Sequence, residues 1–284
     1  MIELEVIDLG SGILELENVG KTFHSERGQE ITALEDIDLS IDEEEFVCIL
    51  GPSGCGKSTL LRMMAGLEKP TSGTILALDK PVVNPIPEAQ MVFQEYSLMP
   101  WRDVLSNVEL GLEMRHVPKA ERRKKAKEML ETFGLGDFTK SFPYELSGGM
   151  QQRVAIARAM ATDPTILYMD EPFGALDANT RYRMQQELHS FWVSAPRTVV
   201  FVTHSVEEAL FLGTRVLIMS GRPGKVIQDI KVRLPFPRNR WSPEFGELFQ
   251  QVMENMGEDL GIPYQDADGF GGPPNPTRCT YGCC

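Results

Sequence analysis

The amino-acid sequence predicts an α/β fold with a mainly parallel sheet, an antiparallel β subdomain and a helical subdomain. Apolar runs without alternation, at 46–50 and 166–169, are typical of strands buried on both faces. Helical segments lie between such strands, which is the order expected of a parallel sheet. Two runs at 13–16 and 33–39 instead alternate apolar and polar residues, as strands of an antiparallel sheet do.

The first elements lead into a strand–loop–helix unit. The polar stretch 25–30 is expected to be the loop that joins the two antiparallel strands. The strand at 46–50 ends at a glycine, and the pattern at 58–66 predicts a helix after it. A turn at 70–73 closes the unit, and 91–93 is a further short strand.

The middle of the chain is predicted to be helical. Between Asn107 and Asp137, apolar residues recur with charged residues between them, and 150–161 is a second strong helical stretch. We therefore expect a helical insertion within the α/β core, at about residues 95–160.

After this insertion the pattern returns to strands. A buried strand is predicted at 166–169, an amphipathic helix at 180–193 and a β-branched strand at 198–202. From Gly221 onward the order weakens, and the prolines in 235–237 exclude a regular helix there.

Composition and charge exclude some classes of function. The chain has 284 residues, 42% hydrophobic and 24% charged, which suits one large α/β domain or a domain with a small appendage. Its formal net charge of −13 repels a phosphate backbone, so nucleic acid is not an expected partner. The basic run 119–127 is interpreted as a solvated helix face, because Glu121 and Glu128 accompany it; a polyanion patch is the alternative.

The lack of a recognisable membrane span or secretory signal, and the positions of the cysteines, lead us to expect a cytoplasmic protein. No apolar run approaches the roughly 20 residues of a membrane span, and the acidic N-terminus is unlike a secretory signal. Cys48 and Cys55 lie in the first buried strand and the loop after it, while Cys279, Cys283 and Cys284 crowd the end. We expect no disulfide framework; the terminal cysteines could bind a metal, bridge two chains, mimic a prenylation ending or have no role.

One segment matches the phosphate-binding pattern G-x-x-x-x-G-K-[ST] without a mismatch. Its glycines let backbone N–H groups point at phosphates, and the following helix adds the positive end of its dipole. A P-loop NTPase core is therefore predicted, with Lys57 at the β- and γ-phosphates, Ser58 at Mg²⁺ and Thr59 at the α-phosphate. The loop consists of Gly51, Pro52, Ser53, Gly54, Cys55, Gly56, Lys57 and Ser58.

An acidic pair follows the strand at 166–169. Asp170 is expected to bind the metal, through water. Glu171 would then lie beside the γ-phosphate, where it can orient and polarise the attacking water. A solvated acidic pair at the end of a strand is the alternative.

A second candidate anion site begins the helix after residue 146. Ser147, Gly148 and Gly149 are small residues at a helix N-terminus, which is a site that favours phosphate. Such a site is redundant with the first loop unless it serves a nucleotide held by another subunit. A structural helix cap by Ser147 is the alternative.

These three motifs, in this order, resemble the ATPase subunit of an ATP-binding cassette (ABC) transporter. The resemblance covers roughly residues 13 to 225 and implies that two copies face each other with ATP between them, bound with Mg²⁺. The Ser147 segment of one copy would close on ATP held by the loop of the other. The family commonly has glutamine at the position of Met150, whose side chain matters less than the serine hydroxyl and glycine N–H groups.

The resemblance assigns roles to four further residues. Phe23 stands where an aromatic residue stacks on adenine; a core phenylalanine is the alternative. Gln94 matches the glutamine that touches Mg²⁺ and water and senses the transmembrane partner. Asp177 matches the loop that links the two active sites, and His204 matches the switch histidine on the γ-phosphate.

The resemblance also divides the chain. An N-terminal extension (1–12) would precede the ATPase domain (13–225), followed by a C-terminal extension (226–268) and a disordered tail rich in Gly, Pro and Cys (269–284). About 60 residues follow Gly224, too few for the additional β-barrel domain of sugar-importer ATPases.

Three segments are similar to the branch that imports nitrate, sulfonates, taurine or bicarbonate-type anions: 99–101, 220–225 and 233–238. The resemblance implies a homodimer or a closely related second ATPase subunit, integral-membrane permease subunits and an extracytoplasmic solute-binding protein. The ATPase would be peripheral, on the cytoplasmic face of the inner membrane. The alternatives are import of a different solute, a soluble ABC ATPase of DNA repair or translation, and a nucleotide-sensing regulator without hydrolysis.

Overall fold

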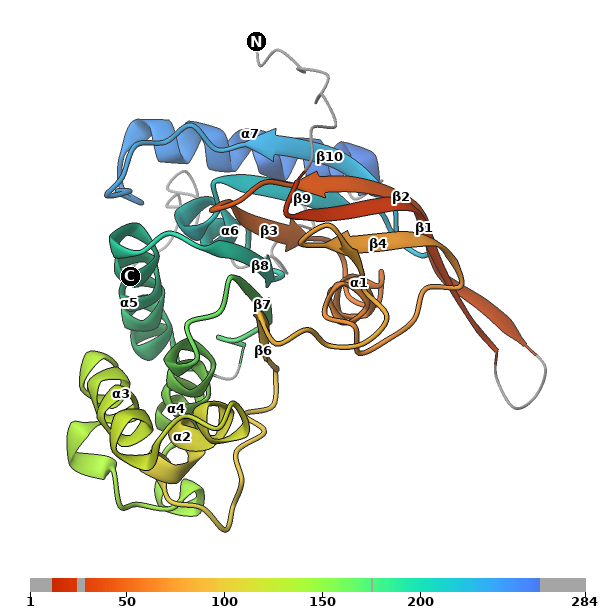
Figure 1. The fold of residues 1–284 in the computed structure, drawn as a ribbon. Helices are drawn as coiled ribbons and strands as arrows, with labels where there is room; N and C mark the ends of the chain where they lie inside the picture. The colour runs from red at the N-terminus through yellow and green to blue at the C-terminus, as the bar shows by residue number, and fades with distance from the viewer. Residues whose placement is uncertain (1–11, 25–28, 175, 261–284) are drawn as a thin grey trace, which may run out of the picture.

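The computed structural model describes residues 12–24, 29–174 and 176–260, and contains two sheets (Figure 1). The smaller sheet has four strands in the order β2-β1-β4-β5, all paired antiparallel. The predicted antiparallel region is therefore confirmed. Its strands are β1 (Leu14–His24), β2 (Glu30–Ile41), β4 (Ser72–Ala77) and β5 (Lys80–Pro81).

The larger sheet has six strands in the order β10-β9-β3-β8-β7-β6. All neighbours pair in parallel except β10, which is antiparallel to β9 and lies at the edge. The predicted mainly parallel sheet is confirmed. Its strands are β3 (Phe46–Leu50), β6 (Ala89–Val92), β7 (Ile166–Asp170), β8 (Thr198–Val202), β9 (Arg215–Met219) and β10 (Val226–Lys231).

Three helices form a separate group to one side of the sheets (Figure 1). These are α2 (Val104–Met114), α3 (Lys119–Thr132) and α4 (Gly148–Ala161), which pack on one another. None of the described helices has the length and apolar character needed to cross a membrane. The others are α1 (Lys57–Met64), α5 (Ala178–Ser194), α6 (Val206–Leu212), α7 (Pro243–Leu260) and two short 3₁₀ turns, Gly136–Phe138 and Pro143–Glu145.

Alternation along β3 divides the core into two layers. Phe46, Cys48 and Leu50 point to the layer shared with α4, α5 and α6, while Val47 and Ile49 point to the layer shared with α1 and the antiparallel sheet. All five residues are fully buried because both faces of the strand are covered.

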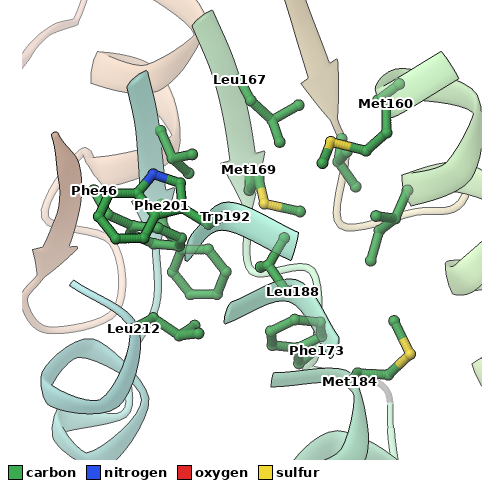
Figure 2. Packing of buried hydrophobic residues seen from close by; sticks show 14 of the residues in the cluster. Phe46, Met160, Leu167, Met169, Phe173, Met184, Leu188, Trp192, Phe201 and Leu212 are labelled. Atoms are coloured by element: carbon green, nitrogen blue, oxygen red, sulfur yellow. The ribbon is translucent and has the colours of Figure 1, made fainter. Parts of the chain in front are cut away.

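The first of these layers is rich in aromatic rings. Figure 2 shows Phe46 beside Trp192 and Phe201. The ring centroid of Phe46 is 5.9 Å from each of these two rings, and the pair with Trp192 is edge-on. This packing attaches the C-terminal part of α5, which carries Trp192, to the sheet.

The basic run lies on α3, where acidic residues pair with most of its charges. Lys124 and Lys125 form i,i+4 pairs within the helix at 3.9 and 3.6 Å. Arg122 and Arg123 lie 3.5 and 3.9 Å from carboxylate oxygens of Glu109 on α2. These pairs fit a solvated helix face rather than a surface for polyanions.

The expected loss of order after Gly221 is wrong for two elements. Strand β10 starts at Val226 because it pairs with β9, so the sheet continues past the domain boundary expected at residue 225. Helix α7 follows the irregular segment around Pro235, because its apolar side chains cover the sheet and α6. The terminal cysteines and most of the two predicted terminal segments lie outside the described residues.

Candidate functional site

The predicted site residues follow the carboxyl ends of four neighbouring parallel strands. The glycine-rich loop follows β3, His204 follows β8, Asp170 ends β7 and Gln94 follows β6. In an open parallel sheet these loops meet at one edge, where ligands bind. The strand order therefore gathers residues that are distant in sequence.

Lys57 lies in the first turn of α1 and is only 6% exposed. Its Nζ donates hydrogen bonds to the carbonyl oxygens of Gly51 at 2.8 Å and Pro52 at 2.9 Å, so the side chain is held inside the loop. Gly56 has φ of 107°, and a Cβ there would lie 2.8 Å from Leu34 Cδ2, so the loop requires glycine at this position. The result is a cation fixed at a helix N-terminus, which favours phosphate.

Ser58 and Asp170 form an oxygen-rich pair beside this loop. Ser58 Oγ donates to Asp170 Oδ1 at 2.8 Å, and burial raises the pKa of the Asp170 carboxyl. Mg²⁺ prefers oxygen ligands and is usually held by one or two protein groups together with phosphates and water. No cluster of three or more potential metal-binding side chains occurs in the described parts of the chain. The pair therefore fits a magnesium–nucleotide complex better than a metal held by protein alone.

Glu171 and His204 face each other across the ends of β7 and β8. Glu171 Oε2 is 3.5 Å from His204 Nδ1. This contact lowers the pKa of Glu171 and raises the pKa of His204. Glu171 adopts φ of 45°, an unusual backbone conformation for a residue with a side chain, and one that is common at active sites. The lowered pKa keeps the Glu171 carboxylate ionised at neutral pH.

An open cavity of about 390 Å³ is lined by residues of the glycine-rich loop together with Phe23, Gln94 and Glu171. Phe23 lies at its edge with 40% of its surface exposed, and Lys21 Nζ is 4.9 Å from the ring centroid. This exposure favours a ring available for stacking over a core phenylalanine. The described residues that line the cavity are Phe23, Ile31, Ala33, Ser53, Gly54, Gly56, Lys57, Ser58, Thr59, Gln94, Glu171 and Arg222.

Several predicted residues are not among the described residues that line this cavity, and Asp170 and His204, at the ends of β7 and β8, are two of them. Ser147 begins α4 within the helical group, and its Oγ accepts from the backbone N–H of Met150 at 3.3 Å (Figure 1). Gly148 and Gly149 follow it, and none of the three is among the described lining residues. Asp177 begins α5 and accepts from the N–H of Thr180 at 3.0 Å. In the glycine-rich loop, Gly51, Pro52 and Cys55 lie behind the lining residues, and Cys55 is buried.

Arg222 is a lining residue that the sequence analysis did not assign to the site. Its Nη2 donates to the carbonyl oxygen of Gly54 at 3.1 Å, and among the described residues no carboxylate is paired with it. The neighbouring cation Lys225, in contrast, lies 3.3 Å from Glu35 and 3.0 Å from Asp36. Arg222 therefore adds to the cavity a positive charge that no described carboxylate pairs with.

A cavity of about 440 Å³ also lies between α3 and α5, lined by residues such as Phe133, Arg183 and Phe191. It is the larger of the two, but it contains no phosphate-binding loop and no strand-end carboxylate. We therefore place the site at the smaller cavity, where motif, charge and sheet edge coincide.

The fold and this cavity define a P-loop nucleotide-binding protein, and comparisons with known proteins specify it. The family model described as "ABC transporter" matches residues 34–174. The chain is 48% identical to an uncharacterized ABC transporter ATP-binding protein, MJ0412, of Methanocaldococcus jannaschii, covering 87% of this chain and 92% of that protein. The chain belongs to the ABC transporter ATP-binding family, and it is an ATPase.

Relatives with a named solute are almost as similar. The taurine import ATP-binding protein TauB of Rhizobium johnstonii is 46% identical, covering 84% of this chain and 95% of that one. The nitrate import ATP-binding protein NrtD of a Synechocystis species is also 46% identical, covering 84% of this chain and 93% of that one. Among solved structures, the dimeric cassette MJ0796, in a post-hydrolysis state bound to ADP and Pi, matches with a TM-score of 0.70 and 36% identity, covering 78% of this chain and all of that one.

The contact between Glu171 and His204 predicts a change in histidine titration. Because the carboxylate raises the pKa of His204, Glu171→Gln should lower it towards its ordinary value. NMR of the His204 ring between about pH 5 and 9 would measure the shift. An equal midpoint in both proteins would contradict the contact.

Proposed function

We propose that this chain hydrolyses ATP in a site that it shares with a second copy or a closely related ATPase subunit. The observation that carries this proposal is the position of Ser147 at a helix N-terminus outside the cavity that contains Lys57. A second anion site of this kind is useful if it closes on nucleotide held by a partner. The dimeric ADP- and Pi-bound state of the related cassette MJ0796 supports the same arrangement.

Each of the predicted site residues has a distinct task. Lys57 binds the β- and γ-phosphates, and Phe23 stacks on adenine. Glu171 orients the attacking water and accepts its proton, while His204 contacts the γ-phosphate. Asp177 connects the two sites of the pair from the start of α5.

Ser58 and Asp170 would hold Mg²⁺ together with Gln94, which lines the cavity as Ser58 does. When bound, the ion would neutralise charge on the phosphates during transfer. Their oxygens are already 2.8 Å apart, which fits a small cation that keeps several waters.

ATP binding would stabilise the closed pair, because its phosphates make contacts that the open pair lacks. Hydrolysis removes the γ-phosphate and these contacts, so the pair reopens. This difference in affinity between the two states is what can move membrane subunits.

Arg222 should strengthen nucleotide binding through its unpaired charge. We expect Arg222→Ala to weaken ATP binding about tenfold and to make it less sensitive to salt. Lys225→Ala is the matched control, because that cation is already paired with two carboxylates. Titration calorimetry with a non-hydrolysable ATP analogue would measure both; equal affinities in the two variants would contradict the role of Arg222.

The subunit would serve an importer of a small anion of the nitrate, sulfonate, taurine or bicarbonate type. The named taurine and nitrate relatives support this class. Its partners would be integral-membrane permease subunits and an extracytoplasmic solute-binding protein, and it would sit at the cytoplasmic face of the inner membrane. Import of a different solute is the second candidate.

Reconstitution with the permease and binding subunits tests the solute class. We expect at least one of nitrate, a sulfonate, taurine or bicarbonate to stimulate ATP hydrolysis, measured as phosphate release in proteoliposomes. Stimulation by sugars or amino acids alone would contradict the anion class while leaving the ATPase assignment intact.

A further inference from the structure

The turn that carries His204 is closed by the residues on either side of it. The hydroxyl oxygen of the buried Thr203 accepts a hydrogen bond from the backbone N–H of Ser205 at 3.1 Å. The same hydroxyl donates to Oε2 of Glu208 at 2.5 Å. Because a hydroxyl has a single proton to donate, this acceptor fixes its orientation. The position of His204 therefore depends on a carboxylate in the first turn of α6.

Glu208 is itself held by α5. Its side chain is buried, and a buried carboxylate is costly unless it is paired and hydrogen-bonded. Oε1 of Glu208 accepts from Nε2 of Gln185 at 2.7 Å, and Arg181 Nε is 3.9 Å from the same oxygen. The Glu208 carboxylate therefore has a hydrogen-bond donor on each oxygen: Thr203, which follows β8, and Gln185 on α5.

Arg181 also holds the segment between Glu171 and Asp177. Its Nε donates to the carbonyl oxygen of Phe173 at 3.2 Å, and its Nη2 donates to that of Leu176 at 3.0 Å. The two segments that carry the predicted hydrolytic residues therefore meet at one side of α5.

The contacts that hold Glu208 extend to Arg240, which lies in the segment after the large sheet. Nη2 of Arg240 donates to Oε1 of Gln185, and Nε of Arg240 lies 2.7 Å from Oε1 of Glu207. The guanidinium is 3.4 Å from the ring centroid of Phe211, and only 6% of the side chain is exposed. The Gln185 amide accepts from Arg240 on its oxygen and donates to Glu208 from its nitrogen, so both contacts fix one amide orientation.

We propose that Arg240 and Glu208 are positioning residues for His204, so that residues 232–241 help to set the rate of ATP hydrolysis. The chain of contacts runs from Arg240 through Gln185 and Glu208 to Thr203 and the turn. The inference rests on the role of His204 in the proposed function. Neither Arg240 nor Glu208 is among the described residues that line the nucleotide cavity, so nucleotide affinity should not depend on them.

The test compares two arginines whose side chains are 6% and 10% exposed, Arg240 and Arg197. Arg240→Ala should lower kcat about tenfold, because a small displacement of a catalytic group is enough to slow the chemical step. Its KM and its affinity for an ATP analogue should stay within about twofold of the wild type. Arg197→Ala is the control: Arg197 also pairs with one carboxylate, Asp163 at 3.2 Å, and lies 4.9 Å above a ring, that of Phe191. This control should keep a wild-type kcat.

A double-mutant cycle shows whether Arg240 acts through the histidine. In His204→Ala, the further change Arg240→Ala should produce no additional loss of kcat. An additional loss of about tenfold, or a kcat of Arg240→Ala equal to that of Arg197→Ala, would overturn the inference. Wild-type kcat in His204→Ala would instead overturn the proposed role of the histidine. If thermal melts show that Arg240→Ala is unfolded, Glu208→Gln, which keeps the side-chain volume, replaces it in the cycle with the same expected outcomes.

Discussion

Glu171→Gln should lower the rate of ATP hydrolysis by about a thousandfold while ATP remains bound. The substitution keeps the size of the side chain but replaces the carboxylate, which can accept a proton from water, with a neutral amide, which cannot. His204 holds the pKa of Glu171 low, so the wild-type residue is a carboxylate at neutral pH and can act as a base. Phosphate release in a single turnover measures the loss directly.

The control for this change is Glu128→Gln, which removes an exposed carboxylate from α3. It should hydrolyse ATP at the wild-type rate. Hydrolysis by Glu171→Gln within about tenfold of the wild type would show that another group activates the water.

Lys57→Ala should abolish tight nucleotide binding, with a loss of affinity of about a hundredfold or more. The ammonium is fixed by two loop carbonyls at 2.8 and 2.9 Å, so it meets the phosphates without a further cost of ordering. Its removal takes away the charge and leaves both carbonyls without their buried donor. Equilibrium binding of a fluorescent ATP analogue measures the effect.

The control for the lost charge is Lys140→Ala, because Lys140 is an exposed lysine outside the glycine-rich loop. Thermal melts of both variants separate lost binding from lost folding. Unchanged affinity in a folded Lys57→Ala protein would contradict the assignment of the glycine-rich loop.

Much of the fold could be predicted because local patterns and tertiary packing agree. Strand β8 has the predicted bounds, 198–202, because a short run of β-branched and apolar residues favours a strand that is buried on both faces. The phosphate loop is equally local: a glycine-rich turn between a buried strand and a helix needs no distant partner to be recognised. The roles of its residues remain proposals, but their positions around one cavity follow from the strand order.

The two elements after Gly221 differ in how far the sequence indicates them. Helix α7 could have been predicted from the sequence. Its apolar residues recur at helical spacing: Phe245, Leu248, Phe249, Val252 and Met256. Strand β10 has only intermediate or exposed residues, and its position at the sheet edge comes from pairing with β9, which no local pattern specifies.

The long-range contacts in the site also could not be predicted from a single sequence. Arg222 and Gly54 are 168 positions apart, and their contact depends on how the turn after β9 lies against the loop after β3. The contacts from Arg240 to Thr203 pass through two helices, α5 and α6, and no spacing in the sequence indicates them.

In the proposed function, one copy completes the active site of another. Light scattering of Glu171→Gln at saturating Mg-ATP measures whether this pair forms, because hydrolysis can no longer separate it. We expect a mass of twice the 31.8 kDa of one chain with Mg-ATP, and the mass of a single chain without nucleotide. A mass of one chain under both conditions, and also beside the membrane subunits, would contradict it.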